Sequence, residues 1–456
     1  MKNSKDNLSR TSNPVQQGST RLENKKERIK FDPTAYSIEN MYDNKAYKYA
    51  IKGKKTQSEE ILQKFKEEYS NYRINWTKQP QECIDKKVDN RKLFELGYKP
   101  LCLDIETASI CDLACPFCYR EYIATPDKTM DKCLAEKLIT EAGELSIPSI
   151  KFNWRGEPLL NPKLPELIDC AKKAGVLETI INTNATTLNE KKAKQIIESG
   201  LDVMIYSFDG GSKETYEKNR PGRFKKNTFD KVYSNIKTFS ETRKKMGRKF
   251  PRTRIQMILT KETFPEQDSF YDLFSEYVDE VLVNTYSERG GSLSELNDEQ
   301  LNTYNKAKKR FGISGEIPFM RDSAGEMWVA PSRLGCEQPY QRLMITYDGR
   351  VGMCCYDWGS KHPVGFVDDS SFAQPDAPYE DIILRVKNDD KGFELLKDVK
   401  MPKTYNYPKT EVSTIKELWV GSEINKVRDL HQNGKVDDVD ICNGCTFKDT
   451  FHWIKA

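Results

Sequence analysis

LCLDIETASICDLACPFC, residues 101–118, joins two patterns that decide the fold. Its first eight residues, 101–108, form an apolar run that is typical of a buried strand. Three cysteines, Cys111, Cys115 and Cys118, come directly after this run, so they lie on the loop that follows the strand. In folds of alternating strands and helices, such a loop lies at the carboxyl end of the sheet, where ligands bind.

Strand-like and helix-like runs alternate from residue 100 onward. The helix-like runs are amphipathic, and two of them end at a glycine, Gly175 and Gly200. Six strands that alternate with helices indicate parallel βαβ units, and six repeats suit a partial barrel better than a closed eight-stranded one. We therefore expect an α/β fold with a partial (β/α)6 barrel. The predicted strands are 101–108, 149–154, 179–184, 202–208, 254–259 and 280–286.

The segments on either side of this core differ from it in composition. Residues 1–31 are polar and lack apolar periodicity, which predicts a disordered arm. Residues 32–96 carry a helical pattern and predict a small helical N-terminal extension before the core at 97–315. Residues 316–456 are rich in turns and cysteine. They indicate a small α+β domain that is not held together by a large apolar core, with an insertion at about 370–410.

Charge and hydropathy narrow the classes of function. The chain has 73 Lys and Arg against 69 Asp and Glu, a net charge of +4, which is too balanced to indicate a nucleic-acid or membrane partner. It has no apolar run of membrane-spanning length, and its first residues have no signal-peptide pattern. We therefore expect a cytoplasmic protein. In the cytoplasm clustered cysteines, among the twelve present, favour metal ligation over disulfides.

The C-x3-C-x2-C spacing of Cys111, Cys115 and Cys118 indicates a site for zinc or an iron–sulfur cluster, because thiolates bind soft metals. A structural zinc site is closed by four ligands. Three cysteines with no fourth nearby instead suit a cubane cluster that leaves one iron open to a small molecule. The alternatives are three core thiols, or a zinc site that a distant cysteine completes.

This spacing, with Phe117 before the last cysteine, resembles the signature of the radical S-adenosylmethionine (radical SAM) superfamily. The resemblance implies a [4Fe–4S] cluster on the three cysteines, with S-adenosylmethionine bound at its open iron. It also implies that reductive cleavage of this cofactor yields a 5′-deoxyadenosyl radical, which takes a hydrogen atom from an unactivated C–H bond. An electron donor such as flavodoxin or ferredoxin is implied as a partner.

The stretch WRGEPLLNP, residues 154–162, ends the second strand and is similar to the GGEP loop of this family. The resemblance implies that Gly156, Glu157 and Pro158 belong to the cofactor site, where the carboxylate of Glu157 binds the methionine ammonium group. Arg155 stands where the first glycine of that motif would be, so the loop itself departs from the family pattern.

Two later loops also resemble cofactor-binding loops, in family order. NTNAT (182–186) resembles the segment after the third strand, with alanine in place of the usual glycine, and implies Asn184 beside the ribose. YSFDGGSKETYEKNRPG (206–222) resembles the loop after the fourth strand. It implies that Ser207 and Arg220 bind the cofactor carboxylate, for which arginine is the natural bidentate partner.

The tail carries a second cysteine set: Cys336, Cys354, and the pair Cys442 and Cys445. With Gly349 four residues before the second of these, the spacing resembles the opening of the SPASM/twitch domains. No cysteine follows Cys445, so the tail is similar to the shorter twitch type, which implies one auxiliary [4Fe–4S] cluster on four cysteines. A structural zinc ribbon is the alternative, because four thiolates suit zinc equally well. The three histidines of the chain form no motif.

Family members with such tails oxidise hydroxyl groups of sugars and aminocyclitols, oxidise side chains in proteins, or crosslink peptides. We predict net oxidation of a carbohydrate-like or other small substrate, with the auxiliary cluster taking the second electron. Asp357, just past Cys354, is the candidate base, and a turn-capping role is its alternative. A peptide-modifying maturase that crosslinks or epimerises is the second hypothesis. The third is a non-catalytic iron–sulfur or zinc protein.

Overall fold

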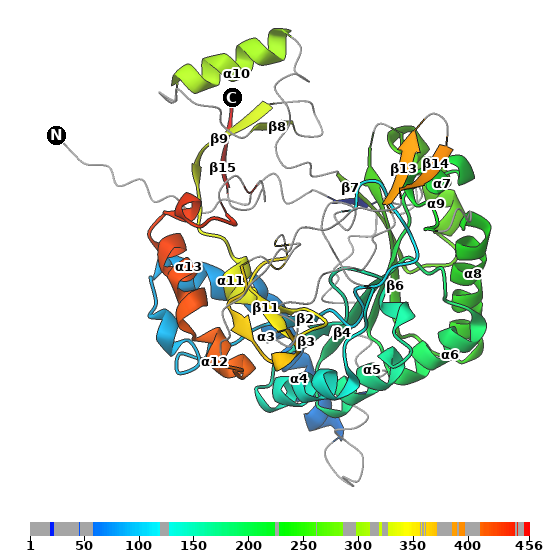
Figure 1. Cartoon of the computed structure of the whole chain (residues 1–456), viewed down its shortest axis with the longest axis horizontal. Helices are drawn as coiled ribbons and strands as arrows, with labels where there is room; N and C mark the ends of the chain where they lie inside the picture. The colour runs from blue at the N-terminus through cyan, green and yellow to red at the C-terminus, as the bar shows by residue number, and fades with distance from the viewer. Residues whose placement is uncertain are drawn as a thin grey trace, which may run out of the picture.

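The core of the molecule is one ten-stranded sheet, with helices packed along one side of it (Figure 1). The structure is a computed structural model of the chain. It describes residues 19–21, 45, 58–118, 127–223, 228–260, 262–285, 298–310, 319–321, 327–355, 357, 360, 362–371, 385–389, 392–396, 411–442, 445 and 451–456.

All six predicted core strands are present. Neighbouring strands from β2 to β7 pair in parallel and lie in chain order across the sheet. This arrangement confirms the prediction of parallel βαβ units. The strands are β2 (Cys102–Ile105), β3 (Ser149–Lys151), β4 (Glu178–Thr183), β5 (Val203–Ser207), β6 (Arg252–Leu259) and β7 (Glu280–Thr285).

The helices between these strands cover the convex face of the sheet (Figure 1). Their ends follow the capping signals of the sequence: the side chain of Asn189 accepts from Lys192 N–H at 3.0 Å to begin one helix, and Gly200, at φ 86°, ends it. The helices are α4 (Lys132–Glu144), α5 (Leu164–Lys173), α6 (Glu190–Ser199), α7 (Lys213–Asn219), α8 (Phe229–Lys245) and α9 (Gln267–Phe274).

Side chains alternate between the two faces of each core strand. Those on the convex face, such as Ile181, Met204 and Ile255, are fully buried beneath the helices. Those on the concave face, such as Asn182 and Gln256, are only half-buried. The concave face is therefore the inner wall of an open barrel, which agrees with the predicted partial (β/α)6 fold.

The C-terminal region continues the core sheet. β10 (Arg342–Ile345) pairs in parallel with β2, and β11 (Arg350–Gly352) and β12 (Gly365–Phe366) follow it in antiparallel order. The backbone groups at the outer edge of β2 thereby pair with β10, so this edge is not exposed. Three strands of the predicted C-terminal domain, residues 316–456, thus belong to the core sheet, whereas β8, β9 and β15 form a sheet of their own.

Helices α11, α12 and α13 lie beside this edge, and α10 with the separate sheet β15-β9-β8 lies above them in the view of Figure 1. The run 414–431, which resembles a single helix in sequence, forms two helices because Gly421 separates them. A hairpin, β13 and β14, lies within the predicted insertion. The elements are α10 (Asp298–Arg310), β8 (Phe319–Arg321), β9 (Met327–Arg333), α11 (Gln338–Gln341), β13 (Arg385–Asp389), β14 (Gly392–Leu396), α12 (Ile415–Trp419), α13 (Ser422–Gln432) and β15 (Phe451–Lys455).

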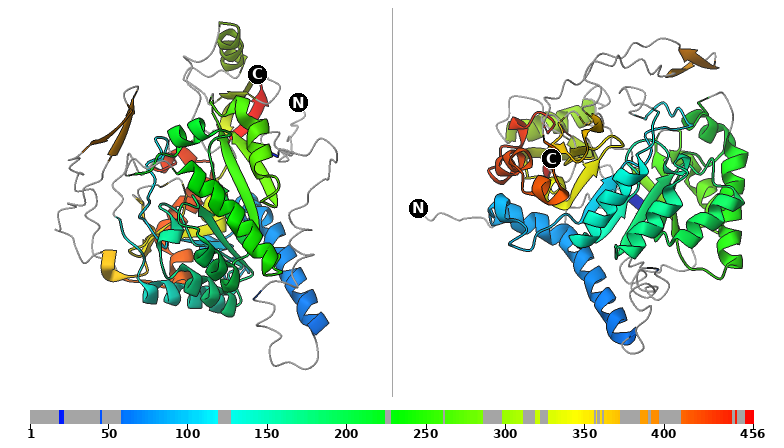
Figure 2. Two further views of the ribbon diagram at one scale, coloured as in Figure 1. Left: turned by 90° about the vertical axis from the view of Figure 1, so that its right-hand side faces the viewer. Right: turned by 60° about the horizontal axis from the view of Figure 1, so that its bottom comes forward.

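The helical extension contains one long helix, α3 (Ser58–Asp85), which runs beneath the barrel and beside the C-terminal elements (Figure 2). The hydroxyl groups of Tyr69 and Tyr72 donate to the two carboxylate oxygens of Glu178 at 2.8 and 3.0 Å. Glu178 is the first residue of β4, so α3 covers the amino ends of the strands. The ligand-binding carboxyl ends lie on the opposite side.

The N-terminal arm differs from its prediction at one place. Ser19–Arg21 forms a strand, β1, which pairs antiparallel with β7 at the edge of the sheet. An unpaired edge of a sheet offers backbone groups to any extended segment, which accounts for this pairing. The other residues of 1–31 lie outside the described residues.

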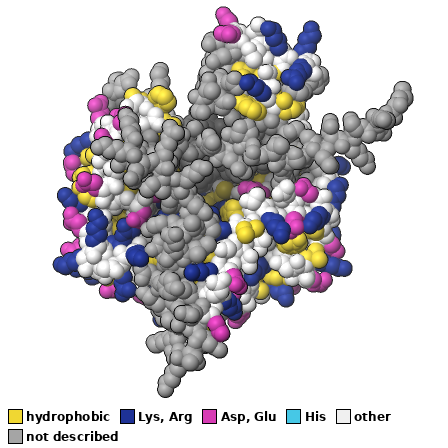
Figure 3. Space-filling model, turned by 180° about the vertical axis from the view of Figure 1, so that it is seen from behind, with side chains coloured by type: hydrophobic (Ala, Val, Ile, Leu, Met, Phe, Trp, Pro, Cys, Tyr) yellow, Lys and Arg dark blue, Asp and Glu magenta, His cyan; other side chains and the backbone are white. Residues whose placement is uncertain are grey.

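The described surface carries charges of both signs. On the face shown in Figure 3, Lys and Arg side chains are interspersed with Asp and Glu side chains. No helix in the described part of the chain combines the length and apolar character that crossing a bilayer requires.

Candidate active site

The first cysteine loop is clamped at the carboxyl end of β2. Leu113 forms an isolated antiparallel bridge with Gly222, and Ala114 N–H donates to Pro221 O at 2.9 Å. A turn closes the loop where Cys118 N–H donates to Cys115 O at 2.9 Å. The loop that carries the cysteines is therefore held by the later loop, 206–222, whose residues were expected to bind the carboxylate group of the cofactor.

Glu157 lies directly beside this loop, and its own N–H donates to Ile110 O at 2.8 Å. Its carboxylate is buried and accepts three hydrogen bonds: from Thr183 Oγ1 at 2.7 Å, Asn184 N at 2.7 Å and Leu159 N at 3.0 Å. Burial raises the pKa of Glu157 to about 7, although these donors lower it. No Lys or Arg in the described part of the chain forms an ion pair with it.

Gly156 allows this close approach. It has φ 65°, and a Cβ atom there would lie 2.4 Å from Ala108 O and 2.7 Å from Ile110 O. Both oxygens belong to the segment between β2 and the cysteines. Only glycine fits, so the loop of Glu157 packs onto the backbone that leads into the cysteine loop.

Arg155, the departure from the family motif, has a partner of its own. Its guanidinium forms two parallel hydrogen bonds with the carboxylate of Glu106, at 2.7 and 2.8 Å, and both side chains are buried. Glu106 also accepts from Tyr347 N–H at 3.2 Å. This bidentate pair fixes the end of β2 to the loop after β3 and to the hairpin of the C-terminal region.

Asn184 joins the third loop to the first. Its side-chain amide donates to Asp112 Oδ1 at 2.9 Å and lies 3.9 Å from Cys111 Sγ. Thr186 Oγ1 donates to the other oxygen of Asp112 at 2.5 Å. The next residue, Ala185, adopts φ 58°, which is a conformation that glycine favours. The alanine at this motif position therefore retains the backbone shape expected of glycine.

Arg220 faces the cysteine loop from the fourth loop. Its guanidinium is held by the buried carboxylate of Asp209 at 2.5 to 2.8 Å and lies 5.9 Å from the centroid of the Phe117 ring. Asp209 Oδ1 also accepts from Ile258 N–H at 2.8 Å. Asp209 is thus an acceptor that orders this loop. Ser207 ends β5 on the concave face, and among the described contacts no hydrogen bond joins it to Arg220.

The four loops therefore bring together most of the residues that the sequence assigned to the first site. A buried carboxylate without a cationic partner, beside three thiols and an arginine, is the donor set that S-adenosylmethionine at a cluster requires. In the described part of the chain, no three His, Cys, Asp or Glu side chains converge tightly enough to hold one metal ion. A cubane cluster binds each thiolate through a different iron, so its ligands are spread more widely than those of a single zinc ion.

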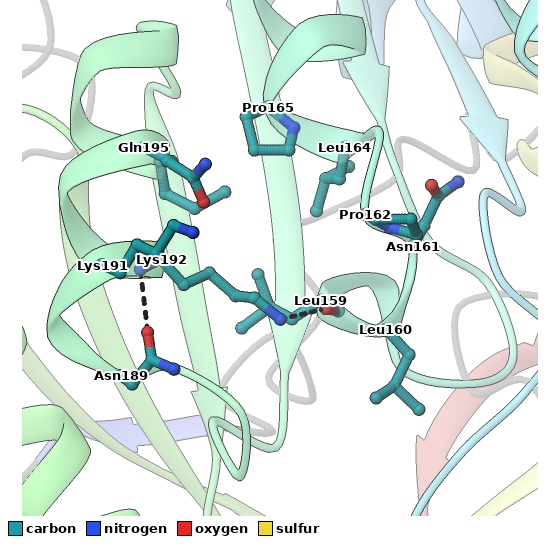
Figure 4. Close-up of a pocket in the computed structure, with 11 residues that line it drawn as sticks. Leu159, Leu160, Asn161, Pro162, Leu164, Pro165, Asn189, Lys191, Lys192 and Gln195 are labelled. Atoms are coloured by element: carbon teal, nitrogen blue, oxygen red, sulfur yellow. Dashed lines mark hydrogen bonds between the residues drawn. The ribbon is translucent and has the colours of Figure 1, made fainter.

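A cavity of about 330 Å³ lies behind the Glu157 loop (Figure 4). Lys192 crosses its inner wall, where the ammonium group donates to Leu159 O at 2.6 Å and to Thr187 Oγ1 at 3.2 Å. The lysine thereby supports the loop from outside the barrel. The lining residues are Leu159, Leu160, Asn161, Pro162, Leu164, Pro165, Asn189, Lys191, Lys192, Gln195 and Ile196.

The hairpin of β10 and β11 brings together two cysteines of the second set. Cys336 precedes this hairpin and Cys354 follows it, so its antiparallel strands bring both cysteines to the same end. Gly349, at φ 88°, forms the turn, and a Cβ atom there would lie 2.6 Å from the Cβ atom of Asp368. The pKa of Cys336 is raised by burial and then by the nearby thiols of Cys354 and Cys442.

His431 belongs to no sequence motif, yet it lies beside two cysteines of the second set. It is buried, its Nδ1 accepts from Cys336 N–H at 3.1 Å, and its Nε2 lies 3.5 Å from Cys442 Sγ. Burial lowers the pKa of His431 to about 4. Its position eleven residues before Cys442, at the end of an amphipathic helix, is the signal that could have drawn attention to it.

Asp357, the candidate base, is buried on a turn after Cys354. Its carboxylate accepts from His362 N–H at 2.9 Å, and its backbone carbonyl accepts from Ser360 N–H at 2.8 Å. These contacts are those of a turn-capping aspartate, the alternative stated above. A catalytic role for Asp357 stays a prediction.

The concave face of the sheet carries half-buried polar side chains. Lys151, at the end of β3, is half-buried on this face and influences the pKa of Cys102 and of Cys355. Among the described residues no carboxylate forms an ion pair with it, whereas the neighbouring Arg342 is paired with Asp104 at 3.0 Å. Within the described part of this face, the ammonium group of Lys151 thus has no carboxylate partner.

Other polar groups of the concave face extend this surface. Asn182 has a buried side-chain oxygen with no hydrogen-bond partner in the described structure, while its N–H donates to Asn153 Oδ1 at 2.7 Å. Arg254 is held by Glu280 at 2.5 Å. Aliphatic side chains of β4 and β5, such as Ile205, complete the wall. The surface is therefore polar with an apolar part.

Comparison with known protein families gives two matches. Residues 105–272 match the model of the radical SAM superfamily, and residues 336–388 match the model of the SPASM iron–sulfur cluster-binding domain. The first model spans the four loops described above, and the second contains Cys336 and Cys354.

Curated relatives match over part of their length. The GTP 3′,8-cyclase of Chlorobaculum tepidum is 31% identical over 112 residues, which cover 25% of this chain and 34% of that protein. A tungsten-containing aldehyde ferredoxin oxidoreductase cofactor-modifying protein of Pyrococcus furiosus is 26% identical over 204 residues, which cover 44% of this chain and 53% of that protein. The chain thus spans about a third to about a half of these relatives.

Two solved structures are similar at low identity. BtrN in complex with AdoMet and 2-DOIA is 16% identical with a TM-score of 0.40, over 77% of this chain and 94% of that one. Streptococcus suis SuiB bound to the precursor peptide SuiA is 17% identical with a TM-score of 0.42, over 73% of this chain and 79% of that one. Similarity at this level does not distinguish between their substrates.

Proposed function

Since this chain is a radical SAM protein with a C-terminal SPASM iron–sulfur domain, and so binds [4Fe–4S] clusters and S-adenosylmethionine, we propose that it oxidises a small polar substrate by two electrons. A hydroxyl-bearing, carbohydrate-like molecule is the substrate class. When bound, the cluster and S-adenosylmethionine supply a 5′-deoxyadenosyl radical. The residues of the protein position the cofactor and the substrate and exclude water.

The observation that carries the substrate class is the concave wall of the barrel. It combines the unpaired ammonium of Lys151 and the unpartnered oxygen of Asn182 with aliphatic side chains such as Ile205. An unsatisfied buried oxygen is costly, so a ligand that donates a hydrogen bond to Asn182 is favoured, and the half-buried ammonium of Lys151 can donate to the same ligand. A carbohydrate, with hydroxyl groups on a carbon framework, fits such a mixed surface.

The proposed reaction balances as follows. Oxidation of a CH–OH group to a carbonyl removes one hydrogen atom from carbon, one proton from oxygen and one electron. The hydrogen atom forms 5′-deoxyadenosine, the proton goes to a base or to water, and the electron goes to the auxiliary cluster. An external donor such as flavodoxin or ferredoxin supplies the electron that cleaves S-adenosylmethionine.

One hydrogen bond between the two sites supports this division of roles. Trp154, which begins the Glu157 loop, donates from Nε1 to Cys355 O at 3.2 Å. Cys355 is adjacent to Cys354, a proposed ligand of the auxiliary cluster. The loop that follows β3 and the segment next to Cys354 are therefore in contact, and a short separation favours electron transfer.

The test begins with anaerobic reconstitution and reduction by dithionite. We expect 5′-deoxyadenosine to form, and its rate to rise with a substrate from a panel of sugars and aminocyclitols. The product should be two mass units lighter than the substrate, with one S-adenosylmethionine consumed for each turnover. Lys151→Met should raise KM for that substrate more than Lys151→Arg, which keeps the charge.

Other outcomes would contradict the proposal. A product of unchanged mass that carries one solvent deuterium, with activity lost in Cys355→Ala, would indicate epimerisation. Turnover of peptides alone would indicate a maturase. A reduced, iron-loaded protein that forms no 5′-deoxyadenosine with or without substrate would indicate a non-catalytic iron–sulfur protein.

A further inference from the structure

His431 contacts two of the four cysteines in the second set. It lies in the last turn of α13 and is 1% exposed. One ring nitrogen, Nδ1, accepts from the backbone N–H of Cys336 at 3.1 Å. The other, Nε2, lies 3.5 Å from Cys442 Sγ. A single imidazole therefore bridges the first and the third cysteine of the set, which are far apart in sequence.

The first contact fixes the position of the ring proton. A backbone N–H can only donate, so Nδ1 must present its lone pair to Cys336. A neutral imidazole then carries its proton on Nε2. Because Nε2 faces Cys442 Sγ, that sulfur is the acceptor of an N–H···S hydrogen bond.

A donor at this place has an electrostatic consequence for a cluster held by the set. A hydrogen bond to a thiolate stabilises negative charge, and a cluster carries more negative charge after it gains an electron. Hydrogen bonds to the sulfurs are one of the factors that set the reduction potential of an iron–sulfur cluster. The N–H of Gln338, which donates to Cys336 Sγ at 3.4 Å, acts in the same direction.

We propose that His431 is a positioning residue that raises the reduction potential of the auxiliary cluster by donating a hydrogen bond to Cys442. This inference rests on the proposed function, in which Cys336, Cys354, Cys442 and Cys445 hold that cluster. A higher potential makes the cluster a better acceptor for the single electron that the substrate releases. His431 is not itself a ligand of iron.

The test compares His431→Phe, which removes both nitrogens at similar volume, with His431→Gln, whose amide can restore one hydrogen bond. The matched control is His362→Phe, an exposed histidine of the same region. Full-length reconstituted proteins are titrated anaerobically and followed by electron paramagnetic resonance. The auxiliary signal is the one that does not change when S-adenosylmethionine is added.

We expect His431→Phe to keep its iron and to show a lower midpoint potential for the auxiliary cluster. The equilibrium constant for reduction should fall about threefold to tenfold, where tenfold corresponds to about 59 mV for one electron. His431→Gln should recover part of this shift, and His362→Phe should match the wild type.

Four results would overturn the inference. An unchanged potential in His431→Phe with full iron content would leave His431 with a purely structural role. Loss of the auxiliary cluster in both His431 variants, or a hyperfine coupling that shows a ring nitrogen bonded to iron, would make it a ligand or an essential support. Zinc in place of the auxiliary cluster in the wild-type protein would contradict the proposed function itself, and the wild-type iron content reveals this before any variant is compared.

Discussion

At the scale of single residues, we expect Glu157 to make cofactor binding depend on pH. Burial raises its pKa to about 7, so below that pH the carboxyl is mostly neutral and cannot pair with an ammonium group. We expect the affinity of the cluster-loaded, unreduced protein for S-adenosylmethionine to rise with pH through 7, by about tenfold from pH 6 upward. Equilibrium dialysis measures this dependence.

Glu157→Gln provides the control for this effect, because it keeps the shape and removes the charge. At pH 8 we expect the binding free energy of S-adenosylmethionine to be less favourable by on the order of a few kcal/mol, since half of a buried charge pair is lost. The affinity of this variant should no longer depend on pH. Iron content should stay unchanged. A variant that binds as tightly as the wild type would refute the role of Glu157.

Gly156 and Ala185 share a positive φ, 65° and 58°, but we expect opposite responses to substitution. Gly156→Ala forces a Cβ to within 2.4 Å of a backbone oxygen, so it should displace the Glu157 loop and abolish cofactor binding.

Ala185→Gly relieves strain of about 1 kcal/mol but loses a buried methyl worth about 0.8 kcal/mol and adds freedom to the unfolded chain. Its free energy of unfolding should change by less than about 1 kcal/mol in urea titrations. A large loss of stability in Ala185→Gly would contradict this balance.

At the scale of elements, the joint between β2 and β10 holds the two halves of the molecule together. Arg342 on β10 pairs with Asp104 on β2, whose side chain is only 2% exposed. Arg342→Met leaves this carboxylate buried without its partner, which should cost about 3–5 kcal/mol. The melting temperature of the reconstituted protein measures the loss.

A second substitution tests the cause of that loss. Asp104→Asn removes the orphaned charge, so the double variant with Arg342→Met should be more stable than Arg342→Met alone. Additive losses in the two single variants would show that the pair does not couple β2 to β10. The same measurement on Arg91→Met, an exposed arginine, should give little change.

At the scale of the whole molecule, two separate cysteine sets predict two clusters, with about eight irons and eight sulfides per chain. Replacing Cys111, Cys115 and Cys118 together by Ala should leave about four irons and remove all cleavage of S-adenosylmethionine. The second set should keep its cluster, because its four cysteines lie in the C-terminal region and not on the barrel loops. Iron and sulfide analysis with the 5′-deoxyadenosine assay measures both effects.

Two results would contradict this assignment. Formation of 5′-deoxyadenosine by the triple variant would show that the open-iron site lies elsewhere. Stoichiometric zinc with only about four irons in the anaerobically purified wild type would favour a zinc ribbon in the tail.

The sequence by itself determined the parallel core and predicted which loop residues would lie together at its carboxyl end. Apolar runs that alternate with amphipathic ones predict βαβ units, and the loop after each strand must lie at the carboxyl end of the sheet. The cysteines, Glu157, Asn184 and Arg220 could therefore be placed together without coordinates. These are local patterns, in which a few adjacent residues specify both the element and the position of the loop after it.

Only the tertiary structure decided how distant segments complete the sites. The pairing of β10 with β2, the Arg155–Glu106 pair and the contact of His431 with Cys336 and Cys442 each join residues that are distant in sequence. Such contacts depend on which edges and buried charges remain unsatisfied after the elements pack, and periodicity contains no information about them. A histidine at a helix end has no motif, and only packing makes it the neighbour of a thiol.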